Sequence, residues 1–202
     1  MSVAVIDTGT NSTRLLVAEV QAGIVSELER RTTVTRLGKG VDADGRLQPA
    51  ARERVSDCVD AYAERISRLG ALRTVVLATS SIRDASDGAD FLAGLAESHD
   101  FEWRLLSGEE EALLSFSGAT LGTSAAGKVT VFDVGGGSTE VVTALNGAIV
   151  FACSLPIGCV RLSERFLKSD PVASDELAEA AAFIDSLIAG ELAPIQLSGK
   201  DN

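Results

Sequence analysis

The residues best suited to chemistry lie in VFDVGGGSTE, residues 131–140, where glycines and small polar residues stand between two acids. A two-residue hairpin turn needs only a pair such as Asn-Gly, so this stretch holds more glycine than a turn requires. Glycine permits positive φ and lacks a Cβ, which lets successive backbone N–H groups converge on phosphate oxygens. The stretch therefore predicts phosphate binding by Gly135, Gly136, Gly137, Ser138 and Thr139, with an ordinary hairpin loop as the alternative.

The N-terminal stretch VAVIDTGTNSTR, residues 3–14, repeats this pattern at an offset of 126 residues without a gap. The matched positions are Val3, Val5, Asp7, Gly9, Ser12 and Thr13 with Val129, Val131, Asp133, Gly135, Ser138 and Thr139. A duplication of this kind predicts two lobes that each present one turn, with a phosphate chain clamped between the turns. Asp7, Asp133 and Glu140 would then supply the oxygen ligands that Mg²⁺ prefers.

Composition and charge exclude several classes of protein. The formal net charge of −11 argues against general nucleic-acid or anionic-membrane binding. No apolar run reaches the roughly 18 residues of a membrane helix, and MSVAVID lacks the basic flank of a signal peptide, so we expect a cytoplasmic protein. His99 is the only histidine, which speaks against a histidine metal cluster or a Ser-His-Asp triad. The three cysteines, Cys58, Cys153 and Cys159, lack metal-ligand spacing and are expected to be buried free thiols.

Strand and helix patterns alternate along the chain and predict an α/β protein. Apolar residues spaced by three, four and seven predict a helix over Pro49–Leu69. Further helices are expected over 87–100, 108–122, 158–167 and 174–192, and further strands over 23–37, 72–80, 102–107 and 147–155. A Gly/Asp loop is expected over 38–47 and an irregular tail over 194–202. Because the first strands form hairpins, the sheet should be mixed.

With both turns in view, the sequence resembles the exopolyphosphatase/guanosine pentaphosphate phosphatase (Ppx/GppA) family of the actin–Hsp70–sugar-kinase superfamily. The matching segments follow the family's order and are DTGTNSTRLLVAEV, VTRLGKGVDADGRL, ATSSIRDA, SGEEEA, FDVGGGSTE and LPIGCVRLSERFLKSDP. The resemblance is greatest to short exopolyphosphatases of the actinobacterial type. It implies two ribonuclease-H-like α/β lobes with mixed five-stranded sheets, and Mg²⁺-dependent hydrolysis of a terminal phosphoanhydride of polyphosphate or of a guanosine polyphosphate. It also implies a possible homodimer.

The resemblance assigns roles to particular residues. Glu111 matches the family's catalytic glutamate, which positions and deprotonates the attacking water, although Glu109 and Glu110 are neighbouring candidates. Asp133 and Glu140 match metal-associated acids, with Asp7 as their counterpart in the first lobe. Thr10, Asn11 and Ser12 match the first phosphate turn, and Arg14 and Arg83 match arginines near the phosphates, where a guanidinium can bind two oxygens. A surface ion pair with Asp84 or Asp87 is the alternative for Arg83, and Arg161, Arg165 and Lys168 form either a basic face that guides polyphosphate or a solvated helix face.

The sequence also departs from the family pattern. Lobe one is expected over residues 1–122 and lobe two over 123–202, but lobe two holds only its opening strands and two helices. An unfinished lobe would expose apolar sheet surface. The leading interpretation is an exopolyphosphatase, and the alternatives are an actin-superfamily kinase or ATPase and a non-catalytic fragment that binds polyphosphate or nucleotide.

Overall fold

The computed structural model describes residues 1–123 and 126–191. The chain divides into two compact units, Met1–Ser107 and Gly108–Asn202, which are described in turn. The expected helix end at Leu192 and the expected tail lie outside the described residues. In the part of the chain that is described, no helix is both long and apolar enough to cross a membrane.

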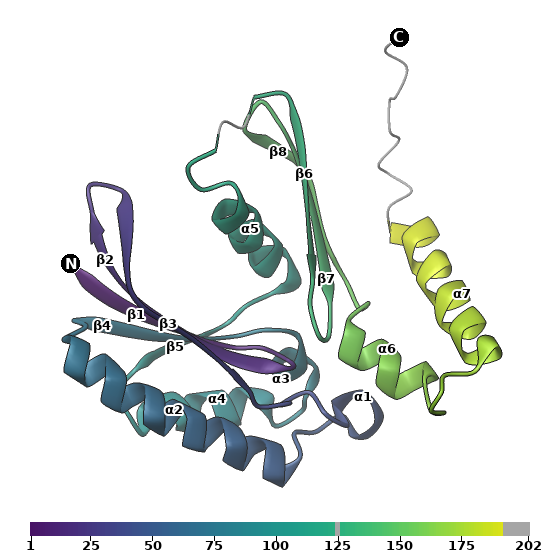
Figure 1. The fold of residues 1–202 in the computed structure, drawn as a ribbon, viewed down its shortest axis with the longest axis horizontal. Coiled ribbons are helices and arrows are strands. Elements are labelled where there is room, and N and C mark those ends of the chain that lie inside the picture. Colours follow the sequence, from purple (N-terminus) through teal and green to yellow (C-terminus); the bar gives the residue numbers. More distant parts are fainter. Residues whose placement is uncertain (124–125, 192–202) are drawn as a thin grey trace. The chain divides into compact units, whose positions relative to one another are not determined.

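The first unit is built on a five-stranded mixed sheet with the strand order β3-β2-β1-β4-β5 (Figure 1). Its strands are β1 (Ser2–Thr8), β2 (Ser12–Gln21), β3 (Ile24–Val34), β4 (Arg73–Ala78) and β5 (Glu102–Leu105). Strands β1 and β2 form an antiparallel hairpin, whereas β1 and β4 run parallel. The prediction of an α/β protein with a mixed sheet is confirmed.

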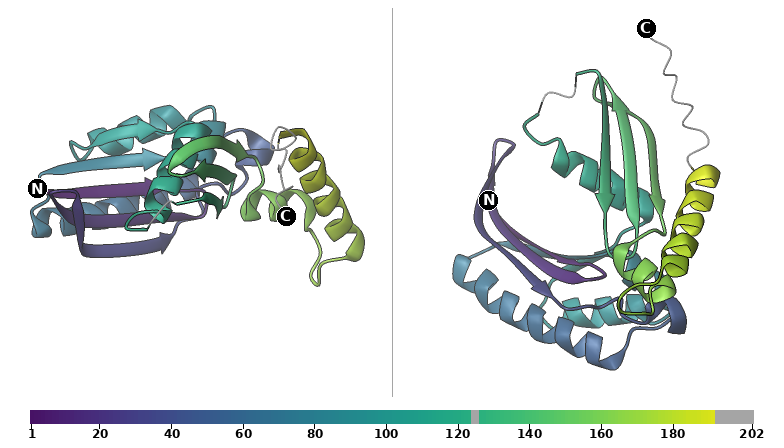
Figure 2. Two further views of the ribbon diagram at one scale, coloured as in Figure 1. Left: turned by 90° about the horizontal axis from the view of Figure 1, so that it is seen from above. Right: turned by 45° about the vertical axis from the view of Figure 1, so that its right-hand side comes forward.

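Helices α2 (Pro49–Leu69) and α4 (Gly88–Glu97) lie on the same face of this sheet (Figures 1 and 2). Pro49 suits the first helical position, where its missing N–H costs no hydrogen bond. Gly70 ends α2 in the left-handed region, with φ of 67°. The predicted apolar side of this helix is confirmed, since its residues are buried against the sheet: Val55, Val59, Tyr62 and Ile66.

Two short helices differ from the sequence-based expectation. Helix α1 (Val41–Asp44) lies within the segment expected as a Gly/Asp loop. Helix α3 (Ser80–Asp84) follows β4 directly, where a longer strand was expected, and its first three residues, Ser80, Ser81 and Ile82, are buried. A short run after a strand carries too few residues to show helical periodicity, so only the tertiary contacts of these segments decide their form.

The second unit is a three-stranded antiparallel sheet of β6 (Lys128–Val134), β7 (Thr139–Leu145) and β8 (Ala148–Leu155) in the described residues. Helix α5 (Gly108–Ala119) packs on one face of this sheet, and α6 (Cys159–Phe166) and α7 (Ser174–Glu191) follow β8. Ala112 and Phe116 of α5 form an apolar cluster with Val142 and Ala144 of β7. This packing is why α5 belongs to the second unit, whereas a boundary at residue 122 would place it in the first.

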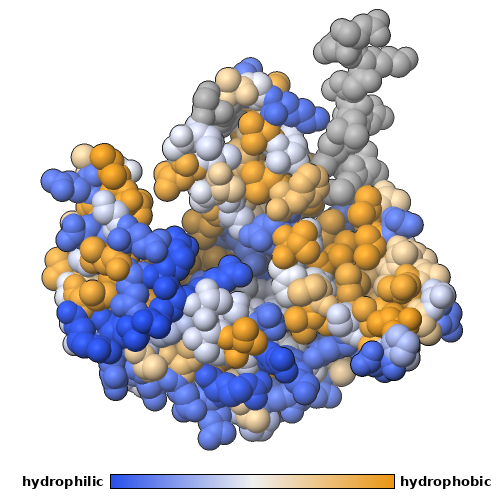
Figure 3. Space-filling model, viewed as in Figure 1, coloured by the Kyte–Doolittle hydropathy of each residue, from blue (hydrophilic) through white to orange (hydrophobic). Residues whose placement is uncertain are grey.

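The second unit exposes apolar side chains, as the sequence led us to expect. Phe132 and Val134 of β6 are 65% and 70% exposed, on the face opposite α5. Figure 3 shows further apolar side chains at the surface of this unit, where Leu177 and Ile188 of α7 are also exposed.

Asp87 ties the loop before α2 to the start of α4 in the first unit. Its Oδ1 accepts a hydrogen bond from the Leu47 N–H at 3.0 Å, and its Oδ2 lies 3.7 Å from Arg46 Nε and 3.5 Å from Arg52 Nη1. The Leu47 N–H, assisted by the two guanidinium groups, lowers the pKa of the Asp87 carboxyl. Asp87 therefore stabilises the folded state above the ordinary carboxyl pKa, and this stabilisation is lost as the pH falls through the lowered value.

We expect Asp87→Ala to lower the free energy of unfolding at neutral pH by about 1.5–3 kcal/mol, the usual worth of a hydrogen bond to a charged group. Urea unfolding over a range of pH measures this. The difference from the unmodified protein should shrink as Asp87 becomes protonated. Asp57→Ala, at an exposed position on α2, removes the same charge and should leave the unfolding free energy nearly unchanged. Equal effects of the two substitutions would contradict the assignment.

Candidate active site

The first turn, residues 8–12 between β1 and β2, is closed by a hydrogen bond from the Gly9 N–H to the Ser12 carbonyl at 3.0 Å. Thr10 is buried, and Asn11 is exposed. The carbonyl groups of Thr10 and Asn11 accept hydrogen bonds from backbone N–H groups of the segment 35–38. The turn predicted to bind phosphate is therefore a defined loop at the end of the sheet.

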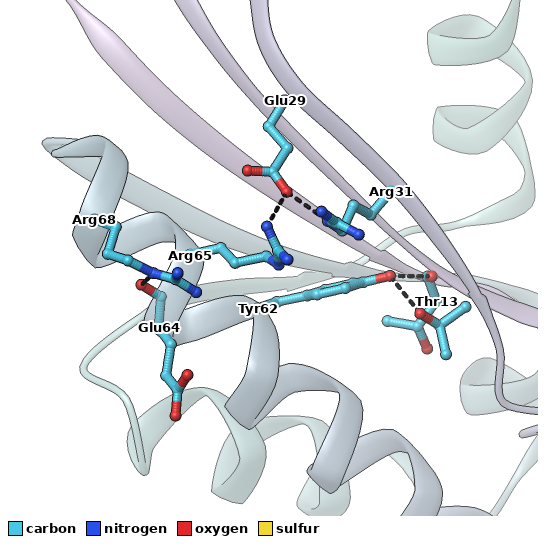
Figure 4. Close-up of polar contacts among 8 residues, drawn as sticks. Thr13, Glu29, Arg31, Tyr62, Glu64, Arg65 and Arg68 are labelled. Carbon is cyan, nitrogen blue, oxygen red and sulfur yellow. Dashed lines mark hydrogen bonds and ion pairs between the residues drawn. The ribbon is translucent and has the colours of Figure 1, made fainter.

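Tyr62 of α2 holds the strand that leaves this turn (Figure 4). Its hydroxyl donates to the Thr13 carbonyl at 3.1 Å and lies 2.9 Å from Thr33 Oγ1. Burial raises the pKa of Tyr62, so the hydroxyl keeps the proton that it donates. Thr13 Oγ1 and Thr35 Oγ1 form a second buried hydrogen bond of 3.0 Å. The β2 side of the turn is thus fixed by side chains from α2 and β3 and by Thr35.

Asp7 and Arg14 are direct partners on β1 and β2, on either side of the first turn. Arg14 Nη1 lies 4.0 Å from Asp7 Oδ2, and both side chains are solvent-accessible. An exposed pair of this kind contributes little to stability.

Arg83 lies in α3 of the first unit, where its Nη1 donates to the Leu106 carbonyl at 2.8 Å. Of its two alternative partners, Asp87 is engaged by Arg46 and Arg52. The Leu106 carbonyl therefore holds one of the guanidinium nitrogens of Arg83 in place.

Buried hydroxyls that sequence reasoning did not single out lie at the start of α3. Thr79, Ser80 and Ser81 are buried, and Ser81 Oγ has no hydrogen-bond partner among the described residues. A Cβ at Gly38 would lie 2.3 Å from Thr10 Cγ2 and 3.2 Å from Ser81 Cβ. Thr10 and Ser81 therefore both lie against Gly38. The only signal in the sequence was the Thr-Ser-Ser run between a buried strand and Arg83.

The second turn, between β6 and β7, repeats the closure of the first. The Gly135 N–H donates to the Ser138 carbonyl at 2.9 Å, as Gly9 does to Ser12 at the offset of 126 residues. Gly137 and Ser138 are buried, and the Thr139 hydroxyl donates to the Ile157 carbonyl. The repeat inferred from the sequence is therefore also a repeat of hydrogen bonding.

Asp133 and Glu140 are direct partners on β6 and β7, so their side chains point to the same face of the sheet. Glu140 is only 2% exposed and accepts a hydrogen bond from Ser154 Oγ at 2.7 Å. Asp133 Oδ2 accepts a hydrogen bond from Ser115 Oγ of α5 at 2.5 Å. Ser115 and Ser154 are thus positioning hydroxyls that the sequence analysis missed, because both lie far from the turn in the chain.

Glu111 lies one helical turn before Ser115 on α5, so it lies on the same side of the helix. Because Ser115 contacts Asp133, Glu111 lies one helical turn from the residue that links α5 to the acidic pair. Glu109 is exposed, whereas Glu110 and Glu111 are half-buried. The second unit therefore carries Glu111, the acidic pair and the glycine turn, and Ser115 joins α5 to Asp133.

The basic residues of α6 are engaged within the second unit. Arg161 Nε donates to the Gly137 carbonyl at 2.9 Å. The Arg165 guanidinium carbon lies 4.4 Å from the centre of the Phe183 ring of α7. Lys168 extends to the Glu164 carbonyl. These contacts argue against a simple solvated helix face for Arg161 and Arg165.

Comparisons with known proteins agree with this geometry. The family model described as the Ppx/GppA phosphatase family matches residues 16–202. Exopolyphosphatase 2 of Mycobacterium tuberculosis is 42% identical, over 90% of this chain and 60% of its own length. The crystal structure of an exopolyphosphatase-like protein superposes with a TM-score of 0.90 at 35% identity, covering 95% of this chain and 61% of that one. A Ppx/GppA family member from Aquifex aeolicus superposes with a TM-score of 0.74 at 31% identity, over 94% and 62%.

The chain thus spans about 60% of the length of these relatives. Their fold confirms the expected actin-like α/β architecture, of which the second lobe is covered in part. The family match includes the second turn and α5, which carries the glutamates. This chain belongs to the Ppx/GppA phosphatase family.

Proposed function

We propose that the protein is a Mg²⁺-dependent exopolyphosphatase that hydrolyses the terminal phosphoanhydride of inorganic polyphosphate. The observation that carries the proposal is the acidic pair Asp133 and Glu140 beside a turn of three glycines, with Ser115 linking Asp133 to the helix that carries Glu111. Family membership and the name of the Mycobacterium tuberculosis relative support this substrate class.

In this proposal, Glu111 accepts the proton of the water that attacks the terminal phosphorus in line with the leaving oxygen. Backbone N–H groups of the second turn, Gly135–Ser138, bind non-bridging phosphate oxygens in the unit that carries Glu111. For the first turn, Arg14 and Arg83 of the first unit, phosphate binding stays a prediction from the family resemblance. These groups act mainly by positioning and by charge stabilisation, which are the main contributions to phosphoryl transfer.

The acidic pair fits a divalent cation. Like charges directly opposite each other on two strands destabilise a sheet unless something neutralises them. Within residues 1–123 and 126–191, no group of three or more His, Cys, Asp or Glu side chains could hold a metal ion. A pair is nevertheless enough for Mg²⁺, which commonly uses one or two protein carboxylates together with substrate phosphates. Asp133 and Glu140 would hold the ion, with Ser115 and Ser154 orienting them, and Asp7 is the candidate in the first unit. When bound, the ion would neutralise phosphate charge.

We expect chelation by EDTA to abolish phosphate release, and Asp133→Asn to raise the Mg²⁺ concentration for half-maximal activity by about 10-fold or more, as for other groups around a metal. The measurement is phosphate release during a Mg²⁺ titration. Asp175→Asn removes the same charge from an exposed position on α7 and should leave the titration unchanged. Identical shifts for both variants would point to a general charge effect and against a site at Asp133.

Guanosine pentaphosphate is the second candidate substrate, because its terminal phosphoanhydride is the same kind of bond. A non-catalytic phosphate-binding module is the competing function, favoured by the partial coverage of the relatives' length. Phosphate release from polyphosphate separates the two, and binding or turnover of ATP would favour a kinase or ATPase. A homodimer and a cytoplasmic location stay predictions from the sequence.

A further inference from the structure

The carbonyl groups of Gly135, Gly136 and Gly137 in the second turn point to the start of α6. The Gly135 carbonyl accepts from the Cys159 N–H at 3.0 Å, and the Gly136 carbonyl accepts from the N–H groups of Val160 and Arg161 at 2.9 and 3.1 Å. The Gly137 carbonyl accepts from the side chain of Arg161 at 2.9 Å. The first N–H groups of α6, which at a helix start often bind phosphate, are here occupied by the turn itself.

Close packing accompanies these hydrogen bonds. A Cβ at Gly158 would lie 2.3 Å from the carbonyl carbon and oxygen of Gly136 and 2.4 Å from the carbonyl carbon of Gly137. Backbone atoms cannot yield as a flexible side chain can, so only glycine permits this approach. Gly158 and Arg161 thus form a backing segment directly behind the turn.

The consequence follows from the geometry of the peptide unit. In a planar trans peptide, the C=O of one residue and the N–H of the next point in opposite directions. Because the carbonyls of residues 135–137 point to α6, the N–H groups of Gly136, Gly137 and Ser138 point away from it. The backing segment therefore sets the direction of three donors at once.

The first unit repeats this arrangement with different residues. The Gly38 N–H donates to the Thr10 carbonyl at 2.8 Å, and the N–H groups of Thr35 and Arg36 donate to the Asn11 carbonyl at 3.1 and 2.9 Å. Gly38 lies against the side chain of Thr10, whereas Gly158 lies against the backbone of Gly136. Arg54 of α2 in turn donates from Nε to the Thr35 carbonyl at 2.8 Å. A segment that bonds to the turn carbonyls thus lies behind both turns. Its presence at both supports a role in the phosphate binding proposed for the turns.

We propose that Arg161 is a positioning residue that holds the Gly135–Ser138 turn with its N–H groups directed at phosphate, and does not itself bind phosphate. This role rests on the proposed function, because polyphosphate is the ligand that the oriented N–H groups would bind. It differs from a basic face that guides polyphosphate, because the Nε–H of Arg161 bonds to the turn itself and its effect on binding would pass through the turn.

The test compares Arg161→Met with Lys168→Met, which removes one positive charge from the end of the same helix segment. We expect Arg161→Met to weaken polyphosphate binding by about 10-fold, the factor that corresponds to one hydrogen bond of ~1.4 kcal/mol, with an unchanged dependence on salt. Lys168→Met should change the dissociation constant less than about 2-fold. Arg161→Lys keeps the positive charge but lacks the planar guanidinium with its Nε–H. This variant should bind polyphosphate as weakly as Arg161→Met.

A shallower salt dependence in Arg161→Met, or full binding by Arg161→Lys, would show that Arg161 acts as a phosphate-binding charge and overturn the proposal. Amide NMR of the ligand-free protein gives an independent measurement. The resonances of Gly136, Gly137 and Ser138 should shift in Arg161→Met and not in Lys168→Met. If the unmodified protein fails to bind polyphosphate, the proposed function fails, whereas unshifted resonances in Arg161→Met refute the positioning role itself.

Discussion

Glu111→Gln is expected to lower phosphate release from polyphosphate by about 10²–10⁴-fold, the usual contribution of a general base. Glutamine has nearly the same shape but cannot accept the proton of the attacking water. The dissociation constant for polyphosphate should change little, because Glu111 is proposed to act on the attacking water and not on the phosphate oxygens. Initial rates of phosphate release and a binding titration measure the two effects separately.

Glu109→Gln is the matched control, because Glu109 lies in the same turn of α5 but is exposed. It should retain nearly full activity. Full turnover by Glu111→Gln would contradict the assignment of Glu111 as the general base. Loss of activity only in Glu110→Gln would instead assign that role to Glu110.

Gly158→Ala is expected to have the second large effect. The added Cβ would meet backbone atoms of Gly136 at 2.3 Å, so the turn or the start of α6 must move. Overpacking of this kind typically costs about 1–3 kcal/mol. We expect a lower unfolding midpoint and polyphosphate binding weakened by about 10-fold or more, since ~1.4 kcal/mol corresponds to one decade. Thermal unfolding and a binding titration measure both.

Gly190→Ala tests whether the effect belongs to the site. Gly190 lies in α7, and a Cβ there would meet nothing within 4 Å. Alanine inside a helix is favoured over glycine by about 0.5–1 kcal/mol, so this variant should be neutral or more stable. A Gly158→Ala protein that binds polyphosphate as tightly as the unmodified protein would contradict the close packing of α6 on the turn.

Much of this architecture could be predicted from local sequence. The spacing of Val55, Val59 and Ile66 identified α2, and the glycine-rich turns stood out because they interrupt alternating strands. The offset of 126 residues predicted two turns of one design, and the closures at Gly9 and Gly135 confirm it. These features are local or periodic, so they are visible without coordinates.

The supporting residues could not be predicted, because each acts on a residue distant in the chain. Ser115 reaches Asp133, and Arg161 reaches Gly137. Gly38 and Gly158 look like ordinary loop glycines until their neighbours Thr10 and Gly136 are known. Helix α3 is too short to carry a periodic signal. Sequence reasoning therefore found the groups proposed for the chemistry more readily than those that position them.

The most direct test is the release of orthophosphate from long-chain polyphosphate by this 202-residue protein, with Mg²⁺ and with EDTA. The proposed function predicts steady release of single phosphates in Mg²⁺, a gradual shortening of the remaining chains, and no release in EDTA. Polyphosphate binding without any release would contradict the enzyme and leave a binding module. Release that is unaffected by EDTA would contradict the role of Asp133 and Glu140.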